Sequence, residues 1–324
     1  MAVRIVVPDD FPTYFGGTPA EARLRELGEV TLHRDRPRDA AGLIDRLRDA
    51  DIAVAVYSKT AYTDAVLAAC PRLKLISRCG TGLEGIDLAA CRRRGVAVAH
   101  LQANDADEIA EHAIALTLCV LRRIGEVDRA LRAGRWDTGH IRGARGLTMG
   151  VVGLGAIGSR TAVLARAIGM TVLAWSFGPD GGRAGRVGAW SVDLDELLRQ
   201  ADVVGLHLRL GPETVGLIDA KRIGLMKRDA VLINTARAGL IDREALIDAL
   251  SAGRIAGVGL DVFHNEPLPA GDPLLGLANV VLTPHNGGNI AAVVARGLAR
   301  AVENVENFLG GAPTGLAVEP GAVR

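Results

Sequence analysis

The chain has 324 residues, of which 49% are hydrophobic, so it is long enough for two domains that each bury a core. Its 38 basic and 37 acidic residues leave a formal net charge of +1, which creates no overall field to attract nucleic acid or an anionic membrane. A disordered chain and a nucleic-acid-binding protein are therefore not expected, and any anion binding must be local.

The cysteines and the apolar segments indicate the cellular compartment of the protein. Cys70, Cys79, Cys91 and Cys119 form no C-x-x-C pair and have no histidine spacing that suits zinc, so we interpret them as buried thiols in a reducing compartment and expect no metal site. The apolar N-terminus is stopped by Pro8 too early for a secretory signal, and the apolar segment 109–121 is too short to cross a bilayer. The sequence predicts a cytoplasmic protein.

Short β-branched runs alternate with helical segments in the first part of the chain. Buried strands are predicted at residues 3–7, 52–57, 73–77 and 96–99. Strands that alternate with helices form a parallel sheet with crossover helices. From residue 105 to 121 the apolar residues recur at helical spacing, and a charged continuation reaches about residue 133. We predict one long helix with an extension here.

The alternation restarts at Leu147. Further strands are predicted near residues 148–152, 171–175, 202–206, 230–234, 257–261 and 279–283. Helices are predicted near 157–168, 193–200 and 243–252, and Asp193 with Glu196 has the spacing of a capping box. A last helix runs from about Asn289 to Leu309 and ends at Gly310-Gly311-Ala312-Pro313.

The predicted fold class is α/β, with two Rossmann-like doubly wound parallel-sheet domains. We expect a dinucleotide-binding domain at residues 102–286. It is inserted into a discontinuous substrate domain that consists of residues 1–101 and 287–324.

A glycine motif begins the second set of strands. Gly153, Gly155 and Gly158 follow an apolar strand in G-x-G-x-x-G spacing, and a helix that contains Ala156 and Ile157 comes next. The first glycine allows a tight turn, the second a close approach to a pyrophosphate, and the third close packing of the helix. The helix N-terminus then faces the phosphates with unpaired N–H groups. An ordinary glycine turn would have the same spacing, so the rest of the chain must decide between them.

The residues after the second strand of this domain bear on the choice of cofactor. Ser176 follows Trp175 at the position where an acidic residue normally accepts the ribose hydroxyls of NAD. Without that carboxylate a 2′-phosphate is not repelled, and Arg183 or Arg186 could pair with it, although both could equally be surface arginines. The sequence therefore favours NADP(H) slightly over NAD(H).

Polar side chains follow three later strands. Arg237 lies in Asn-Thr-Ala-Arg-Ala-Gly, Glu266 in Asp-Val-Phe-His-Asn-Glu-Pro, and His285 in Thr-Pro-His-Asn-Gly-Gly. Each alone could be a surface cation, a rim carboxylate or a turn residue. Because the carboxyl ends of strands in a doubly wound sheet meet at the ligand crevice, we expect the three to meet beside the cofactor.

In order and spacing these motifs resemble the D-isomer-specific 2-hydroxyacid dehydrogenases over nearly the whole chain. The segment from Arg78 to Asp87 is similar to the family's substrate loop, and Ala110-Glu111-His112 to the start of its interdomain helix. Two positions depart from the family pattern: Glu108 stands where a small hydroxyl residue is frequent, and Gly85 where asparagine is frequent.

The resemblance implies a role for each site residue. Arg237 would bind the carboxylate and carbonyl oxygen of the substrate, and His285 would act as general acid or base. Glu266 would orient His285 and favour its protonated form, while backbone N–H groups near Thr81 and Gly82 would bind the substrate carboxylate. The cofactor would contact residues of the glycine motif and of the strand ends, namely Gly153, Gly155, Ala156, Ile157, Gly158, Trp175, Ser176, His207, Thr235, Ala236, Asp261 and Gly287.

We therefore expect an NAD(P)-dependent oxidoreductase that interconverts a 2-oxo acid and a D-2-hydroxy acid. The long charged helix and the extension from Arg122 to Arg145 would suit a homodimer interface, as they do in the family, although a solvated face would explain the same charges. Two alternatives remain. One is a formate- or phosphite-type dehydrogenase of the same fold, although formate enzymes that resemble this family tend to have glutamine in place of Glu266. The other is a non-catalytic protein that senses NAD(H). His112, inside an apolar helix, is interpreted as a core histidine.

Overall fold

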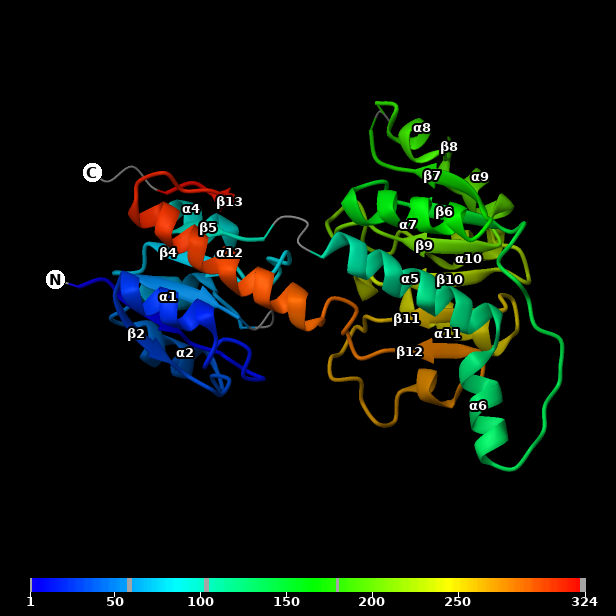
Figure 1. The fold of residues 1–324 in the computed structure, drawn as a ribbon, viewed down its shortest axis with the longest axis horizontal. Helices are drawn as coiled ribbons and strands as arrows, with labels where there is room; N and C mark the ends of the chain where they lie inside the picture. The colour runs from blue at the N-terminus through cyan, green and yellow to red at the C-terminus, as the bar shows by residue number, and fades with distance from the viewer. Residues whose placement is uncertain (1, 57–59, 102–104, 179–180, 321–324) are drawn as a thin grey trace. The chain divides into compact units, whose positions relative to one another are not determined.

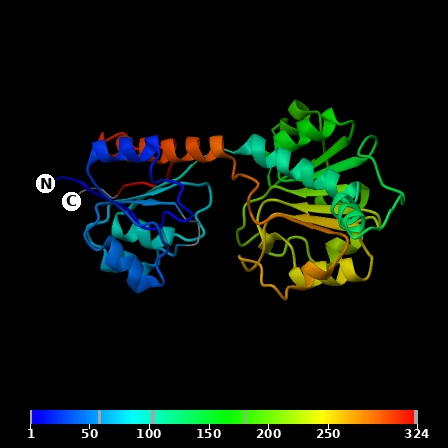
Figure 2. The same ribbon diagram turned by 60° about the horizontal axis from the view of Figure 1, so that its bottom comes forward.

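The computed structural model describes residues 2–56, 60–101, 105–178 and 181–320. The chain divides into two compact units, Met1–Asn104 with Ile290–Arg324, and Asp105–Asn289. Each unit contains one sheet with helices on both faces (Figures 1 and 2). The predicted boundary at residue 102 and the predicted strand end at residue 57 lie outside the described residues. Which unit binds the substrate stays a prediction.

The first unit is built on a six-stranded sheet in the order β13-β5-β4-β3-β1-β2. Neighbouring strands are parallel, except that β13 runs antiparallel to β5. The strands are β1 (Arg4–Val7), β2 (Glu29–Leu32), β3 (Ile52–Ala55), β4 (Leu75–Arg78), β5 (Ala97–Ala99) and β13 (Leu316–Val318).

Alternate residues of these strands supply two separate cores. Ile5 and Val7 of β1 pack with α1 (Pro19–Leu27) and α12 (Ala291–Leu309), which lie side by side on one face of the sheet (Figure 2). Val6 points to the other face and packs with α2 (Ala40–Leu47), α3 (Asp64–Ala69) and α4 (Leu88–Arg94). The period of two along a strand therefore places a core on each face.

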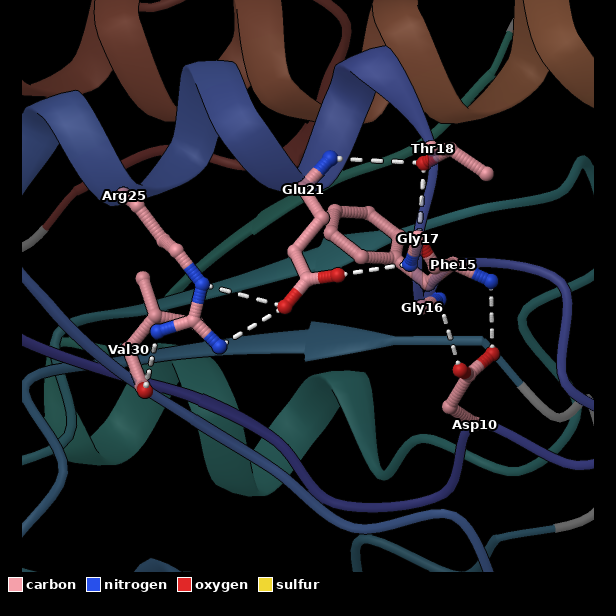
Figure 3. Close-up of polar contacts among 8 residues, drawn as sticks. All are labelled: Asp10, Phe15, Gly16, Gly17, Thr18, Glu21, Arg25 and Val30. Carbon is pink, nitrogen blue, oxygen red and sulfur yellow. Dashed lines mark hydrogen bonds and ion pairs between the residues drawn. The ribbon is translucent and has the colours of Figure 1, made fainter.

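The turn that enters α1 is held by its own polar groups (Figure 3). Thr18, the N-cap residue, accepts the Glu21 N–H with Oγ1 at 3.3 Å, and Glu21 Oε2 accepts the N–H of the preceding residue, Gly17, at 2.6 Å. The arrangement differs from a capping box only in that Glu21 binds the residue before the N-cap. The buried carboxylate of Asp10 accepts the N–H groups of Tyr14, Phe15 and Gly16. Local hydrogen bonds thus fix the chain at the carboxyl end of β1.

The helix α12 ends as predicted. Gly310 donates its N–H to the Glu306 carbonyl at 2.8 Å, and Gly311 has φ +76°, a conformation that glycine adopts at low cost. Its buried residues include Leu298, Val302 and Val305. Within the described part of the chain, no helix combines the length and the apolar character needed to cross a membrane.

The second unit is built on a seven-stranded parallel sheet in the order β12-β11-β10-β9-β6-β7-β8. The strands are β6 (Thr148–Val152), β7 (Thr171–Trp175), β8 (Trp190–Ser191), β9 (Val203–Leu206), β10 (Val231–Asn234), β11 (Gly257–Leu260) and β12 (Val280–Leu282). The chain reverses its direction of travel across the sheet between β6 and β9, which makes this the topological switch point.

Helices cover both faces of this sheet. On one face α5 (Ala106–Leu121) and α7 (Ala156–Ala167) pack on residues such as Met149 and Val151. On the other face α9 (Leu194–Gln200), α10 (Ala220–Leu225) and α11 (Arg243–Ser251) pack on residues such as Val204 and Leu232. The remaining helices of the unit are α6 (Ile124–Arg132), α8 (Arg183–Val187) and the 3₁₀ turns η1 (Ala238–Leu240) and η2 (Pro273–Gly276).

Several local predictions were wrong. The long helix is interrupted after Leu121, because Arg123 takes a left-handed conformation with φ 51°, so α5 and α6 are separate helices. Asp193 precedes α9 as predicted but makes no side-chain cap, and Glu196 accepts the side-chain amide of Gln200 instead. Three short strands that lack a strong alternating pattern, β2, β8 and β13, were not predicted.

The cysteines are free thiols, but not all of them are buried. Cys70 and Cys91 are buried, whereas Cys79 and Cys119 are partly buried. Burial raises the pKa of Cys79 to about 12 and that of Cys91 to about 11. These two thiols therefore stay protonated and unreactive near neutral pH.

Candidate active site

The glycine-rich turn joins β6 to α7. Gly153 has φ +104°, and a Cβ there would come within 2.6 Å of the His207 carbonyl oxygen. A Cβ on Gly158 would lie 1.9 Å from the Gly153 carbonyl oxygen. A Cβ on Gly155, the N-cap residue of α7, would meet no described atom within 4 Å. Close packing within the protein therefore leaves no room for a side chain at Gly153 or Gly158. Gly155 instead faces open space, next to the first turn of α7 where Ala156 and Ile157 lie.

Two polar side chains at the ends of neighbouring strands lack a hydrogen bond to any described group. His207 follows β9, and both of its ring nitrogens are buried without a partner. Burial lowers the pKa of His207 to about 4, so its ring is neutral at pH 7. Thr235 follows β10, and its buried Oγ1 is also unpartnered. A buried polar atom without a hydrogen bond costs about 1–3 kcal/mol of folding stability, so such atoms are uncommon unless they bind something else, such as a ligand.

A cavity of about 420 Å³ opens at the carboxyl end of β7. Ser176 lines it and accepts the Leu154 N–H at 2.7 Å, which ties the end of β7 to the glycine turn. Among the described residues that line the cavity, the ionisable ones are Asp193 and Glu196. The open glycine turn, the orphaned Thr235 hydroxyl and this cavity together fit a dinucleotide laid along the carboxyl edge of the sheet.

The two arginines considered for a 2′-phosphate lie on α8. Arg186 Nη1 donates to the Gly181 carbonyl at 3.2 Å. Arg183 is the first residue of the same short helix. Trp175, which precedes Ser176, is packed edge-on against Phe177 with 4.7 Å between the ring centroids. The acidic lining of the cavity was not anticipated from the sequence.

The end of β10 positions Arg237 through a buried asparagine. Asn234 is fully buried, its Oδ1 accepts the Ala236 N–H at 3.0 Å, and its Nδ2 donates to the Arg237 carbonyl at 2.9 Å. Arg237 Nη1 donates to the Ala236 carbonyl at 2.8 Å. The Asn234 side chain therefore shapes the turn that contains Thr235, Ala236 and Arg237.

Glu266 and His285 form a hydrogen-bonded pair. His285 Nδ1 lies 2.8 Å from Glu266 Oε2, and Glu266 Oε1 accepts the Phe263 N–H at 2.9 Å. Because a carboxylate can only accept, Nδ1 carries the hydrogen, which leaves Nε2 as the nitrogen that can exchange a proton elsewhere. The His285 side chain is 45% exposed and that of Glu266 is 17% exposed, so the pair is open to a ligand on the histidine side.

Asp261, predicted to contact the cofactor, holds the turn after β12. Its carboxylate accepts the Thr283 hydroxyl at 2.6 Å and the N–H groups of Asn286 and Gly287 at 3.0 Å. Burial raises the pKa of Asp261, but hydrogen bonds from His112, Thr283 and these amides outweigh it, and the net pKa is lowered. Gly287, the other residue predicted here, is part of this turn.

His112 was missed as a contributor to the site. It is not an isolated core histidine, because its Nε2 lies 2.9 Å from Thr283 Oγ1 and 3.4 Å from Asp261 Oδ1. The motif Ala110-Glu111-His112 was the available signal, but its position in an apolar helix favoured the core interpretation.

The predicted substrate loop belongs to the other unit and is described by itself. It follows β4, whose last residue Arg78 is only 6% exposed and donates from Nη1 to the Ala55 and Val56 carbonyls. Arg78 Nε also donates to the Gly82 carbonyl at 3.4 Å. The loop that contains Thr81 and Gly82 is thus connected to the sheet through a buried guanidinium group.

Comparison with known proteins identifies the family. The sequence model for the D-isomer specific 2-hydroxyacid dehydrogenase NAD binding domain matches residues 114–287, more than half of the chain. D-3-phosphoglycerate dehydrogenase of Mycobacterium leprae is 38% identical over 311 residues, which are 94% of this chain and 58% of that protein. The chain therefore belongs to the D-isomer-specific 2-hydroxyacid dehydrogenase family, and it spans little more than half the length of such curated relatives.

Solved structures agree with this assignment. An acyclic imino acid reductase (Bsp5), in complex with NADPH and D-Arg, superposes with a TM-score of 0.88 at 29% identity, covering 98% of this chain and 100% of the other. D-lactate dehydrogenase from Aquifex aeolicus, complexed with NAD and lactic acid, gives a TM-score of 0.82 at 30% identity, covering 95% and 96%. The family and the fold class predicted from the sequence are confirmed, and the domain that matches the family binds a nicotinamide cofactor.

Proposed function

We propose that this protein catalyses hydride transfer between a nicotinamide cofactor and a 2-oxo acid/D-2-hydroxy acid pair. The observation that carries the proposal is the pairing of His285 Nδ1 with Glu266 Oε2 at 2.8 Å, at the carboxyl edge of a sheet whose glycine turn fits a dinucleotide. Membership of the family supports the reaction class, and the hydrogen-bonded pair of an imidazole and a carboxylate supports catalysis rather than cofactor binding alone.

Each proposed catalytic residue has a separate task. His285 gives a proton from Nε2 to the carbonyl oxygen during reduction and takes one from the alcohol during oxidation. Glu266 holds the imidazole ring in the orientation and tautomer that this exchange requires. Arg237 binds the substrate carboxylate and carbonyl oxygen with its planar donor group, and the amides near Thr81 and Gly82 add donors for the carboxylate.

The cofactor site is proposed to follow the carboxyl edge of the second sheet. When bound, the nicotinamide supplies or accepts the hydride. The pyrophosphate would lie at Gly155, Ala156 and Ile157, between Gly153 and Gly158, where the helix N-terminus has unpaired N–H groups. Trp175 and Ser176 would lie near the adenosine, and His207, Thr235, Ala236, Asp261 and Gly287 would line the remaining strand ends.

The choice between NADP(H) and NAD(H) depends on the cavity at Ser176. The absence of a carboxylate at Ser176, with Arg183 and Arg186 on the neighbouring helix, supports a slight preference for NADP(H). Asp193 and Glu196, which line the cavity, oppose it by repelling a 2′-phosphate. Steady-state KM values for NADH and NADPH decide the matter. Ser176→Asp should raise the KM for NADPH at least tenfold if the phosphate binds there, because a carboxylate then faces it.

The proposed reaction is tested by following NADH and NADPH absorbance with a panel of 2-oxo acids, which includes pyruvate and the oxidised form of 3-phosphoglycerate. Turnover that is lost in Arg237→Ala, with cofactor binding intact, supports the proposal. Cofactor binding without oxidation by any 2-oxo acid overturns it. Formate oxidation alone would instead favour the formate-type alternative, and a partner protein whose affinity follows NADH would favour the sensor.

We also propose that the chain forms a homodimer through α6 and the segment that follows it. This part of the second unit lies apart from the sheet (Figure 1) and exposes large apolar side chains, namely Ile124, Leu131, Trp136 and Ile141. Trp136 is 83% exposed, an unfavourable position for an indole ring in a monomer. Light scattering after size exclusion should give the mass of a dimer, and Leu131→Glu with Trp136→Glu should give a monomer.

A further inference from the structure

The turn after β12 is connected to a helix far away in the sequence. His112, on α5, lies with Nε2 2.9 Å from the Thr283 hydroxyl and 3.4 Å from Asp261 Oδ1. The His112 side chain is 20% exposed and that of Asp261 is 1% exposed, so this contact is largely shielded from water. Thr283 and the two residues whose amides Asp261 binds, Asn286 and Gly287, lie on either side of His285.

Close packing fixes the position of the helix that carries His112. His112, Leu116 and Val120 follow one another at intervals of four residues and therefore share a face of α5. That face lies on β11: a Cβ on Gly259 would come within 3.0 Å of Leu116 Cβ, and one on Gly257 within 2.9 Å of Val120 Cγ1. The glycines let the helix approach the strand, which delivers His112 to the strand's carboxyl end.

The donors and acceptors can be assigned without ambiguity. The Thr283 hydroxyl has one hydrogen, and its 2.6 Å contact with the Asp261 carboxylate uses it. Thr283 Oγ1 must then accept from His112, so Nε2 of His112 carries a hydrogen. The chain of donors runs from His112 to Thr283 to Asp261, and each member is oriented by the next.

The turn needs such support, because its central residue is strained. His285 has φ 54°, a left-handed conformation that costs a residue with a Cβ about 1 kcal/mol or more. Gly287 is packed so closely that a Cβ there would lie 3.0 Å from both Asp261 Oδ2 and His112 Cδ2. The imidazole ring of His112 therefore donates a hydrogen bond to Thr283 and also packs closely against the backbone at Gly287.

We infer that His112 is a positioning residue, which holds the Thr283–Gly287 turn through Thr283 and Asp261 and so fixes where His285 presents its Nε2. The consequence for turnover rests on the proposed function. The consequence for the turn itself does not, and it is measurable in the protein without cofactor.

Two substitutions of His112 distinguish the effect of its hydrogen-bond donor from the effect of its ring packing. His112→Phe keeps a ring beside Gly287 but removes the donor, and His112→Gln restores a donor near the position of Nε2 without the ring. Leu116→Val is the matched control, because it weakens the packing of the same helix face one turn away from the loop. Hydrogen exchange of the Asn286 and Gly287 amides and steady-state kinetics are measured in all four proteins, together with Tm.

His112→Phe should speed exchange of the two amides about tenfold and lower kcat about tenfold, with KM changed less than about threefold, since a displaced acid affects the reacting state most. His112→Gln should recover most of both losses, and Leu116→Val should lower Tm without either. Unchanged exchange and kcat in His112→Phe, or equal losses in Leu116→Val, overturn the inference. If the native protein has no turnover, the proposed function fails, and amide exchange alone decides the positioning role.

Discussion

The turn after β6 and the turn after β12 leave the same edge of the same sheet, but they are built in different ways. The first is shaped by glycines within six residues, where Gly153 and Gly158 let backbone atoms approach closely. The second places a histidine, His285, in a left-handed conformation and depends on Asp261 and His112 to hold it. One turn presents backbone N–H groups, and the other presents a side chain.

This difference follows from what each turn has to bind. A pyrophosphate is recognised by several backbone donors at once, so removing side chains is sufficient, and the information is local. A proton-transfer group must be placed to within a fraction of an ångström, so its rotamer and backbone are fixed by contacts from other elements. We expect changes in the two turns to separate cofactor binding from turnover.

The largest effect is expected at the second turn. His285→Asn keeps a polar side chain of similar reach but removes the group that exchanges the proton, so kcat should fall about 10²- to 10⁴-fold. The dissociation constant of the cofactor, measured by fluorescence titration, should stay within about threefold of the native value, because the glycine turn is untouched. A parallel loss of cofactor affinity would show that the two turns do not act separately.

The next effect is expected at the first turn. Gly158→Ala would place a Cβ 1.9 Å from the Gly153 carbonyl oxygen, so backbone must move. We expect a loss of about 3 kcal/mol in the free energy of unfolding, at the upper end of what overpacking costs, and weaker cofactor binding. Urea denaturation of the cofactor-free protein measures the first quantity, and fluorescence titration the second.

Gly155→Ala is the matched control for this prediction. Its Cβ would meet no described atom within 4 Å, so its cost in stability should be smaller than that of Gly158→Ala. Cofactor affinity should nevertheless fall, because the methyl group would occupy the space proposed for the pyrophosphate. Equal stability losses in the two variants would contradict the assignment of separate roles to these glycines.

The same contrast explains what the sequence could predict. The seven-stranded sheet and the glycine turn depend on local periodicity and spacing, and the strands from β6 to β12 were predicted to within a residue or two, with the exception of β8. β8 has two exposed residues, Trp190 and Ser191, and forms only beside β7, so no local pattern marks it. The break at Arg123 also lacks a proline or glycine at that position.

The contacts that hold the site residues in place could not be predicted from local sequence patterns. His112 and Thr283 are 171 residues apart in the chain, and neither pattern nor composition indicates that they touch. Asp193 occupies the predicted N-cap position, but whether its side chain caps the helix or lines a cavity depends on residues that pack around it. The types of residue in the site could be predicted, whereas the contacts that orient them required the fold.

The smallest effect concerns another histidine at this edge, His207, which has no described hydrogen-bond partner, unlike His112. Burial lowers its pKa from 6.5 to about 4. Below pH 6.5 the unfolded chain therefore binds a proton that the folded chain does not bind until about pH 4, so stability is lost as the pH falls through this window.

His207→Gln should remove this dependence. The native protein should lose free energy of unfolding between pH 7 and pH 5, and in His207→Gln this loss should be about 2 kcal/mol smaller. The figure follows because a proton bound by the unfolded chain alone costs about 1.36 kcal/mol for each pH unit below 6.5, and pH 5 lies 1.5 units below it. Urea denaturation of the cofactor-free protein at the two pH values measures it, and replacement of the exposed His140 by glutamine should leave the difference in place. If the native protein and His207→Gln lose stability equally, His207 already has a partner when the protein is in solution, and the contrast with His112 disappears.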